Sequence, residues 1–304
     1  MKGKPLQVSV CLPSGAEPWA EALQAALPEA RVTLWQPDDP PADYALIWHP
    51  PAAFFAEQGA LRAVFSAGAG VDAFIDRVPP GLPLYRTEDA GMGALMAEYV
   101  LHALLHWYRG FDRYDAQTCW QMLPPEARED WSVGLLGYGV LGRAVAQPLK
   151  ALGFPVRGWV RSPRQADIPL AAGLAELPGF LARTRLLVAL LPLTPETRGL
   201  LDAQRFAQLP RGACFVNVAR GDLVVQADLM AALDSGQLHA ARLDVCSPEP
   251  LPPEHPLWRH PGVRLSPHVA AHTPRAAAVA QLAGKIRALV RGEAVSGRVG
   301  PQGY

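Results

Sequence analysis

Short apolar runs alternate with polar turns rich in glycine and proline through the first third of the chain. One longer run, Trp19–Leu27, predicts a helix between the first two of the strands given below. Strands that alternate with helical stretches are typical of a parallel sheet covered by helices on both faces. The predicted strands are Leu6–Leu12, Arg31–Trp35, Tyr44–Trp48, Leu61–Phe65 and the shorter Leu82–Tyr85.

The hydrophobic pattern changes at Met92 and predicts one long helix over Met92–Phe111, without an internal proline. This helix is apolar over much of its circumference, so we expect it to be buried between domains or subunits. A charged, aromatic arm that contains Trp120 follows over Asp112–Asp130. The positions that recur at helical spacing are Leu95, Tyr99, His102, Leu105 and His106.

A second series of alternating strands and helices begins at Trp131. Helices are predicted over Leu141–Leu152, over 226–236, where Ser235-Gly236 ends the helix, and over Pro274–Arg291. The candidate strands are 131–137, 155–160, 186–191, 213–218, 240–245 and 263–265.

Two points at which the chain crosses between domains are expected near Met92 and His268, so the last helix should return to the first domain. This organisation predicts two domains, one made of 1–92 with 272–304 and the other of 93–271. A length of 304 residues also favours two domains over one.

Composition narrows the classes of partner. The formal net charge is zero, so no overall field favours nucleic acid or an anionic membrane. No apolar run reaches the roughly 18 residues of a membrane span, and the N-terminus lacks the apolar core of a signal peptide. The four cysteines show no metal-binding spacing, and most lie in apolar stretches. We expect a cytoplasmic protein with reduced thiols and no metal centre.

A glycine-rich loop, G-Y-G-V-L-G at Gly137–Gly142, lies between a predicted strand and a predicted helix. Gly137 allows a tight turn, Gly139 lets a pyrophosphate approach the backbone, and Gly142 allows close packing of helix and strand. Free amides and the positive end of the helix would face the phosphates. The alternative is an ordinary glycine-rich turn between a strand and a helix.

The end of the next strand bears on the choice between NAD and NADP. An acidic residue there would bind the ribose hydroxyls of NAD, but the chain has Val160 at this position. Arg161, Ser162 and Arg164 follow, and a guanidinium suits a 2′-phosphate. We therefore predict NADPH, with NADH as a weaker possibility. The alternative is a solvated pair of surface arginines.

Arg220, Glu249 and His268 are the candidate catalytic residues, each in or after a segment that follows a predicted strand. A guanidinium can bind a substrate carboxylate through two hydrogen bonds. An imidazolium can protonate a developing alkoxide, and a carboxylate partner stabilises its charge. From the residues alone Arg220 could instead form a surface ion pair. The histidines that compete with His268 are His239, His255, His260 and His272.

A second glycine-rich turn, F-S-A-G-A-G-V-D at Phe65–Asp72, follows a strand of the first domain. Its exposed amides would form an anion-binding nest for a substrate carboxylate. A simple turn between a strand and a helix is the alternative.

With these residues in view, the chain resembles the D-isomer-specific 2-hydroxyacid dehydrogenases, in particular their bacterial glyoxylate/hydroxypyruvate reductase A branch. The likeness spans nearly the full length. Its motifs are W-H-P-P at Trp48–Pro51, F-S-A-G-A-G-V-D, Y-R-T-E-D-A-G-M-G at Tyr85–Gly93, the phosphate loop, L-L-P-L-T-P-E-T at Leu190–Thr197, N-V-A-R-G-D at Asn217–Asp222, L-D-V-C-S-P-E-P-L-P at Leu243–Pro252 and S-P-H-V-A-A at Ser266–Ala271.

The resemblance implies two Rossmann-like α/β domains with parallel sheets around a central cleft, a flavodoxin-like substrate domain and an NAD(P)-binding domain. It implies a homodimer joined through the coenzyme domain. It also implies a substrate pocket that includes Trp48, for which core packing is the alternative. The remaining implied contacts are catalysis by Arg220, Glu249 and His268, substrate binding by the amides of Ala69, Gly70 and Val71, and cofactor binding by Gly137, Tyr138, Gly139, Val140, Leu141, Gly142, Arg161, Ser162, Arg164, Leu190, Pro192, Ala219 and Asp244.

These expectations converge on NADPH-dependent reduction of a small 2-keto acid, glyoxylate or hydroxypyruvate, with His268 as the general acid. One alternative is a related dehydrogenase for a larger 2-keto acid. The other is a non-catalytic, nucleotide-sensing protein of the corepressor type.

Overall fold

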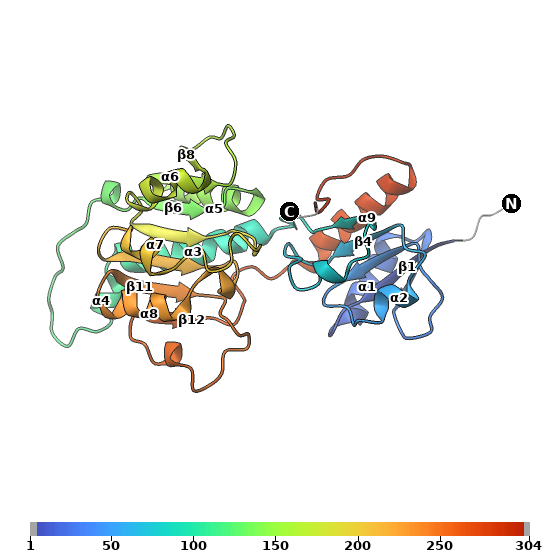
Figure 1. Cartoon of the computed structure of the whole chain (residues 1–304), viewed down its shortest axis with the longest axis horizontal. Coiled ribbons are helices and arrows are strands. Elements are labelled where there is room, and N and C mark those ends of the chain that lie inside the picture. Colours follow the sequence, from blue (N-terminus) through green and yellow to red (C-terminus); the bar gives the residue numbers. More distant parts are fainter. Residues whose placement is uncertain (1–4, 301–304) are drawn as a thin grey trace. The chain divides into compact units, whose positions relative to one another are not determined.

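The computed structural model describes residues 5–300, and the chain divides into two compact units. The first unit joins Met1–Gly91 with Thr273–Tyr304, and the second consists of Met92–His272. Each unit is an α/β layer structure built on one parallel sheet, so the predicted fold class is confirmed (Figure 1).

The sheet of the first unit has five parallel strands in the order β2-β1-β3-β4-β5. This is the flavodoxin-like order. All five predicted strands exist, and their ends differ from the prediction by no more than two residues. The strands are β1 (Leu6–Cys11), β2 (Ala30–Leu34), β3 (Tyr44–Ile47), β4 (Ala63–Ser66) and β5 (Leu84–Tyr85).

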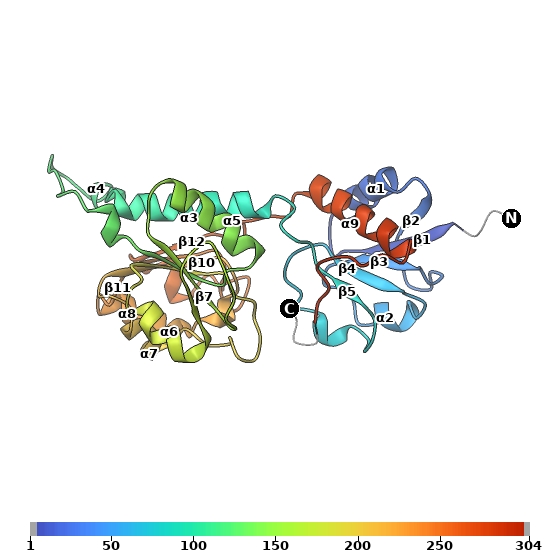
Figure 2. The ribbon, with the colours of Figure 1, turned by 90° about the horizontal axis from the view of Figure 1, so that it is seen from above.

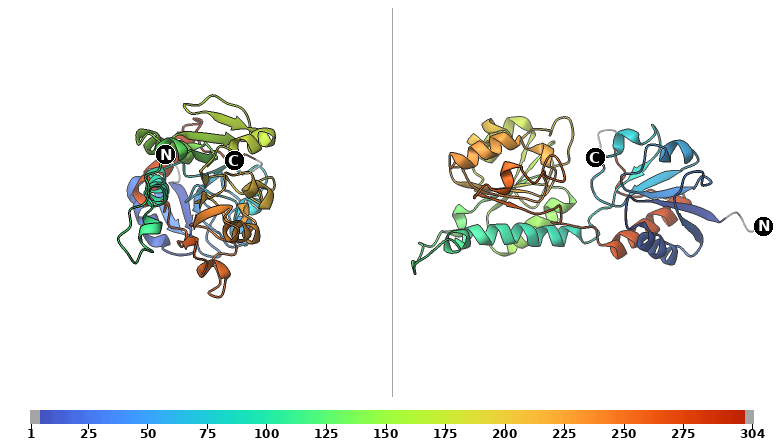
Figure 3. Two further views of the ribbon diagram at one scale, coloured as in Figure 1. Left: turned by 90° about the vertical axis from the view of Figure 1, so that its left-hand side faces the viewer. Right: turned by 90° about the horizontal axis from the view of Figure 1, so that it is seen from below.

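Helices cover both faces of this sheet (Figure 2). On one face, α1 (Ala16–Ala26) and α9 (Arg275–Val290) lie side by side (Figure 3). Leu282 and Ile286 of α9 pack with Val8 of β1 in the same buried cluster, so the last helix completes the core of the first unit. The other face carries α2 (Phe54–Glu57) and the short helix η1 (Ile75–Arg77).

The sheet of the second unit has seven parallel strands in the order β12-β11-β10-β9-β6-β7-β8, which is the Rossmann order extended by one strand. The direction of connection reverses between β6 and β9, and ligands of such sheets bind at the carboxyl ends beside this switch point. The strands are β6 (Val133–Leu136), β7 (Val156–Val160), β8 (Leu170–Ala172), β9 (Leu186–Ala189), β10 (Ala213–Asn217), β11 (Leu238–Leu243) and β12 (Val263–Leu265).

On one face of this sheet lie α3 (Met92–Tyr108) and α5 (Val140–Ala151), and on the other lie α6 (Gly173–Leu181), α7 (Ala203–Ala207) and α8 (Gln226–Asp234) (Figure 2). Among residues 5–300, no helix is long and apolar enough to cross a membrane. The remaining short elements are α4 (Phe111–Tyr114), η2 (Arg128–Asp130), η3 (Gly221–Leu223) and η4 (Pro256–Trp258).

The long helix α3 is shorter than predicted, and the sheet selects its buried face. It ends at Tyr108 rather than Phe111, because Gly110 adopts a left-handed conformation with φ of 67° and separates α3 from α4. The predicted positions at helical spacing are half-buried or exposed. The buried face instead consists of Met96, Ala97, Val100, Ala103, Leu104 and Trp107, which pack on the sheet.

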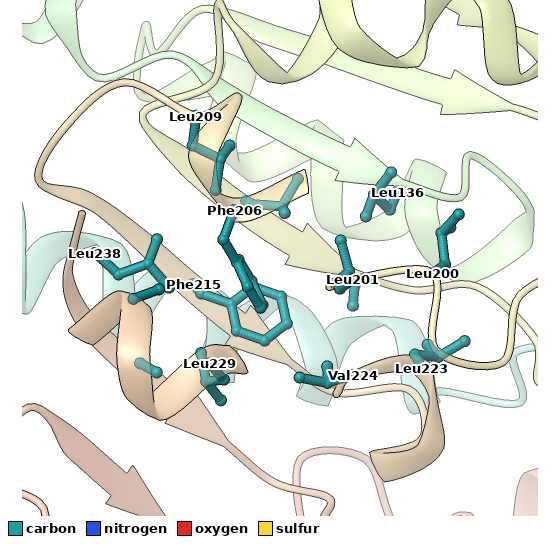
Figure 4. Close-up of a cluster of buried hydrophobic side chains, with 14 of the residues drawn as sticks. Leu136, Leu200, Leu201, Phe206, Leu209, Phe215, Leu223, Val224, Leu229 and Leu238 are labelled. Carbon is teal, nitrogen blue, oxygen red and sulfur yellow. The ribbon is translucent and has the colours of Figure 1, made fainter. Parts of the chain in front are cut away.

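The core under α7 and α8 is built around two phenylalanine rings (Figure 4). Phe206 of α7 and Phe215 of β10 meet edge to face with their ring centroids 5.8 Å apart. Both are fully buried, and such pairs favour this geometry. This packing fixes β10, and with it the segment that carries Arg220.

Candidate active site

Arg220, Glu249 and His268 follow three neighbouring strands of the second sheet. Arg220 comes after β10, Glu249 after β11 and His268 after β12, and these strands pair in parallel. Because the carboxyl ends of parallel strands lie at the same edge, the fold places all three residues there.

Glu249 and His268 form a hydrogen-bonded pair. His268 Nδ1 lies 2.9 Å from Glu249 Oε2, and the other carboxylate oxygen of Glu249 accepts the Cys246 amide at 3.0 Å. Burial raises the pKa of Glu249, but the hydrogen bonds from His268 and Cys246 and the nearby charges of His268 and Arg220 outweigh it, so the pKa lies below its usual value. The carboxylate therefore stays ionised near neutral pH and holds Nδ1, which leaves Nε2 to meet a reactant.

Arg220 is held by its own turn and by a close backbone contact. Its carbonyl accepts Asn217 Nδ2 at 2.9 Å, and its guanidinium donates to the Ala219 carbonyl at 2.6 Å. A Cβ atom added to Gly221 would lie 2.0 Å from the backbone of Cys246. Only glycine therefore lets the segment after β10 pack on the loop that carries Glu249.

The loop between Asp244 and Glu249 is fixed from a third side by Gln226 at the start of α8. Gln226 Nε2 donates to the Ser247 carbonyl at 2.5 Å, and its Oε1 accepts the Ser247 amide at 3.3 Å. The peptide bonds before Pro248 and Pro250 are both cis.

Asp244 organises the turn that presents His268. Its buried carboxylate accepts the amides of Val269 at 2.9 Å and Ala270 at 2.8 Å, and the Ser266 hydroxyl at 2.6 Å. The Asp244 carbonyl also accepts the His268 amide at 2.8 Å. His268 has a φ of 57°, a conformation that a non-glycine residue keeps only when its surroundings impose it. Asp244 was predicted to contact the cofactor, and in the structure its hydrogen bonds serve this turn.

The predicted phosphate loop lies at the switch point, between β6 and the first turn of α5. The amides of Tyr138 and Gly139 donate to no acceptor within residues 5–300, and the amides of Val140 and Leu141 belong to the free first turn of the helix. A Cβ atom on Gly142 would lie 2.3 Å from the Gly137 carbonyl oxygen, so this position requires glycine. The loop thus presents unpaired amides at a helix N-terminus, as a pyrophosphate requires.

The neighbouring predicted cofactor residues also lie at this edge. Buried Val160 ends β7, and Arg161, Ser162 and Arg164 follow on an exposed segment. Leu190 follows β9, where its carbonyl oxygen would lie 2.8 Å from a Cβ atom on Gly137. The other predicted contacts here are Pro192, after β9, and Ala219, after β10.

In the first unit, Trp48 packs over the second glycine-rich turn. Its ring would lie 2.8 Å from a Cβ atom on Gly68, and it meets Phe74 edge to face. The amides of Ala69, Gly70 and Val71 donate to no acceptor within the described part of the chain. The backbone amides of this turn are therefore available to bind an anion. The Trp48 ring packs against Gly68 and Phe74.

Three of the four competing histidines have other partners. His239 pairs with Asp112, His260 pairs with Asp234, and His255 accepts the Leu257 amide. His268 differs from them because it shares its loop edge with both Glu249 and Arg220.

Sequence reasoning missed the residues that hold the site in place. They are Tyr99, Asn217, Gln226 and Ser266. Gly221 in N-V-A-R-G-D carried a signal, because a glycine beside a candidate catalytic residue suggests close backbone approach. Tyr99 carried no such signal. Its hydroxyl lies 2.6 Å from Ser266 Oγ, but Ser266 is 167 residues away in the chain.

A phosphate loop at the switch point of a Rossmann sheet, beside an arginine and a glutamate–histidine pair, defines an NAD(P)-dependent oxidoreductase. The chain belongs to the D-isomer specific 2-hydroxyacid dehydrogenase family, whose NAD binding domain matches residues 100–270. The resemblance predicted from the motifs is thereby confirmed.

Relatives match nearly the whole chain. A glyoxylate/hydroxypyruvate reductase A from Serratia proteamaculans (strain 568) is 48% identical over an alignment of 296 residues, and the alignment covers 93% of this chain and 95% of that protein. A Xanthobacter autotrophicus Py2 member of the family, solved with NADPH and MES, is 41% identical with a TM-score of 0.93 and covers 99% of this chain and 100% of its own. The NADPH-dependent glyoxylate/hydroxypyruvate reductase of Sinorhizobium meliloti, solved with NADP and sulfate, is 36% identical with a TM-score of 0.92, over 98% and 100% of the two chains.

Proposed function

We propose that this protein reduces a small 2-keto acid, glyoxylate or hydroxypyruvate, to the corresponding 2-hydroxy acid with NADPH. The observation that carries the proposal is the placement of Arg220 and the Glu249–His268 pair at the carboxyl ends of adjacent strands, on the same sheet edge as the phosphate loop. The 48% identical Serratia protein is named for this activity, and both solved relatives described above contain NADPH or NADP.

The residues present fit NADPH. Unpaired amides at Tyr138 and Gly139 would bind the pyrophosphate at the N-terminus of α5. Val160 replaces the acid that would repel a 2′-phosphate, and Arg161, Ser162 and Arg164 on the exposed segment would bind it. NADH lacks that phosphate, so we expect it to be the weaker cofactor.

When bound, the cofactor supplies the hydride that reduces the keto carbon. Arg220 binds the substrate carboxylate and stabilises the negative charge that develops on the keto oxygen. His268, held through Nδ1 by Glu249, donates a proton from Nε2 to that oxygen. Asp244 keeps the histidine turn in its left-handed conformation.

The first unit offers further substrate contacts. We propose that the amides of Ala69, Gly70 and Val71 bind the substrate carboxylate, because they point to no acceptor within residues 5–300. Trp48, which packs on Gly68 of the same turn, would line the substrate pocket.

We also propose a cytoplasmic homodimer joined through the second unit. Trp120 and Met122, in the arm that follows α3, are almost fully exposed, and large apolar side chains of this kind are typical of subunit contacts. Free cysteines, of which Cys11 and Cys214 are buried, are typical of a reducing compartment.

Initial rates with glyoxylate, hydroxypyruvate, pyruvate and phenylpyruvate, each with NADPH and with NADH, test the proposal. We expect the highest kcat/KM with glyoxylate or hydroxypyruvate and NADPH. A preference for phenylpyruvate would indicate a dehydrogenase of larger acids. Tight NADPH binding without turnover of any acid would indicate a nucleotide sensor and overturn the proposal.

A further inference from the structure

The segment between β7 and β8, residues 161–169, carries the arginines proposed to bind the 2′-phosphate of NADPH. Apart from Ile168 it is exposed, and it begins where β7 ends. An exposed segment of this length needs a tether to hold its side chains at a defined place. Two of its tethers lead to one residue of the phosphate loop, Tyr138.

Tyr138 contacts the segment at two points. Its hydroxyl donates to Asp167 Oδ1 at 2.5 Å, and its carbonyl oxygen accepts a hydrogen bond from the Arg164 guanidinium. The ring is buried, with 2% of the residue exposed, so the hydroxyl has a fixed direction. Arg164 and Asp167 of the segment are thereby tied to the loop that would bind the pyrophosphate.

Asp167 is also bound to the helix that starts at the phosphate loop. Lys150 Nζ of α5 lies 2.6 Å from Asp167 Oδ2 and 3.2 Å from the Asp167 carbonyl oxygen. Burial and the hydrogen bond to Asp167 raise the pKa of Tyr138 to about 12, and the hydrogen bonds from Lys150 and Tyr138 lower the pKa of Asp167 to about 2. The phenol therefore remains a donor and the carboxylate an acceptor across the working range of pH.

The strand beneath makes room for this arrangement. A Cβ atom on Gly158 of β7 would lie 3.2 Å from Tyr138 Cβ and 2.7 Å from Leu170 Cδ2. Glycine at this position lets the Tyr138 ring and the returning segment pack against β7. The Gly158 amide also donates to the Pro169 carbonyl at 3.0 Å, which fixes the end of the segment.

We infer that Tyr138 is a specificity-determining residue, whose side chain positions residues 161–167 so that their cationic groups select NADPH over NADH. The inference rests on the proposed use of NADPH. It adds a role for the side chain of Tyr138, which the binding of a pyrophosphate by backbone amides does not require. Since NADH has no 2′-phosphate, loosening the segment should affect NADPH alone. The Lys150–Asp167 pair is exposed and weak by itself, so the buried tyrosine is the main tether.

The test compares Tyr138→Phe with the wild type and with Tyr114→Phe. The control also removes one hydroxyl from the second unit, and that hydroxyl accepts the Leu123 amide, far from the segment. We expect Tyr138→Phe to raise the KM for NADPH about tenfold and to leave kcat and the KM for NADH near wild-type values. Calorimetry with 2′,5′-ADP and with 5′-AMP gives a readout without turnover. Only the affinity for 2′,5′-ADP should fall.

Two variants at Asp167 test the same hydrogen bond from its exposed side. Asp167→Ala removes the acceptor, whereas Asp167→Asn keeps an acceptor oxygen for Tyr138, and both remove the charge. We expect Asp167→Ala to resemble Tyr138→Phe and Asp167→Asn to bind 2′,5′-ADP more tightly than Asp167→Ala does. These variants also decide the matter if Tyr138→Phe does not fold.

Equal losses for NADPH and NADH in Tyr138→Phe, or equal affinities of the two Asp167 variants for 2′,5′-ADP, would overturn the inference and leave Tyr138 a purely structural residue. A wild-type enzyme that prefers NADH would contradict the proposed function instead. The wild-type cofactor preference is therefore measured first.

Discussion

His268 Nδ1 and Glu249 Oε2 lie 2.9 Å apart although 19 residues separate them in the chain. The pair joins the loops that follow β11 and β12, two adjacent parallel strands. The carboxylate fixes which ring nitrogen faces the reactant, so the orientation of the histidine is set before substrate binds.

Replacing His268 by glutamine should remove the general acid and leave the fold intact. We expect kcat for glyoxylate reduction to fall about 10²- to 10⁴-fold, the usual contribution of a positioned acid. NADPH binding, followed by fluorescence titration, should stay within about twofold because His268 does not belong to the phosphate loop. Turnover that remains at the wild-type level at every pH would rule out this role.

Glu249→Gln should lower turnover through the histidine. A neutral amide holds His268 Nδ1 less firmly than the carboxylate does, so kcat for glyoxylate reduction should fall about tenfold. Steady-state rates with saturating NADPH measure this. An unchanged kcat would show that the carboxylate does not act through the histidine.

The same variant gives a stability signature of known sign. The pKa of Glu249 is lower in the folded protein than in the unfolded chain, where it is about 4.3. The ionised carboxylate therefore contributes to the free energy of unfolding at pH values above about 4.3. This contribution is lost as the pH falls through the lower pKa of the folded state. The difference between wild type and Glu249→Gln in urea denaturation should therefore shrink below about pH 4. A difference that grows on acidification would contradict the lowered pKa.

Arg220→Ala should reduce both substrate binding and turnover, since the guanidinium acts on the carboxylate and on the developing oxyanion. Loss of charged hydrogen bonds of this kind costs about 3 kcal/mol, which is a decrease of about 100-fold in kcat/KM. Arg220→Lys keeps the charge without the planar fork and should recover only part of the loss. Full recovery by lysine would mean that charge alone suffices.

Asp244→Asn tests whether this carboxylate serves the turn or the cofactor. An amide nitrogen cannot accept the bonds that the two carboxylate oxygens take from Ser266, Val269 and Ala270. We expect the free energy of unfolding to fall by about 1–3 kcal/mol and kcat to fall with it. Unchanged stability with a raised KM for NADPH would instead indicate that the cofactor contact dominates.

Gly221→Ala should disrupt the site through the backbone. The added methyl would lie 2.0 Å from Cys246, so the segment after β10 must move away from the Glu249 loop. We expect a destabilisation of about 3 kcal/mol or more and little activity. Gly284→Ala in α9 is the matched control because, outside the helix's own backbone, no atom of residues 5–300 lies within 4 Å of the added methyl, and it should leave activity unchanged.

The strands and the phosphate loop were predictable because their signals are local. Apolar runs bounded by turn residues gave all of the strands except β8, which has three half-buried residues and pairs only with β7. The predicted end of α3 was wrong by three residues, and its buried face could not be predicted. Its wide apolar circumference left several faces equally suited to packing, and the sheet decided between them.

The candidate catalytic residues could be predicted from the sequence, but the residues that hold them in place could not. Arg220, Glu249 and His268 lie in short segments with strong local signatures, and the matching family motifs favoured His268 among several histidines. The hydrogen bonds that fix them, such as Ser266 to Asp244 and Gln226 to Ser247, join segments whose proximity depends on the order of strands in the sheet. Residue spacing carries little information about that order.

The core of the first unit is closed by α9, which is synthesised after the whole of the second unit. Leu282 and Ile286 are buried together with Val8 and Leu23, which are synthesised before that unit. Residues 92–272 can consequently fold while the earlier strands still expose an apolar face. Termination after His272 and before Arg275 would leave that face open, so such truncated chains should aggregate through the first unit while the second stays native-like.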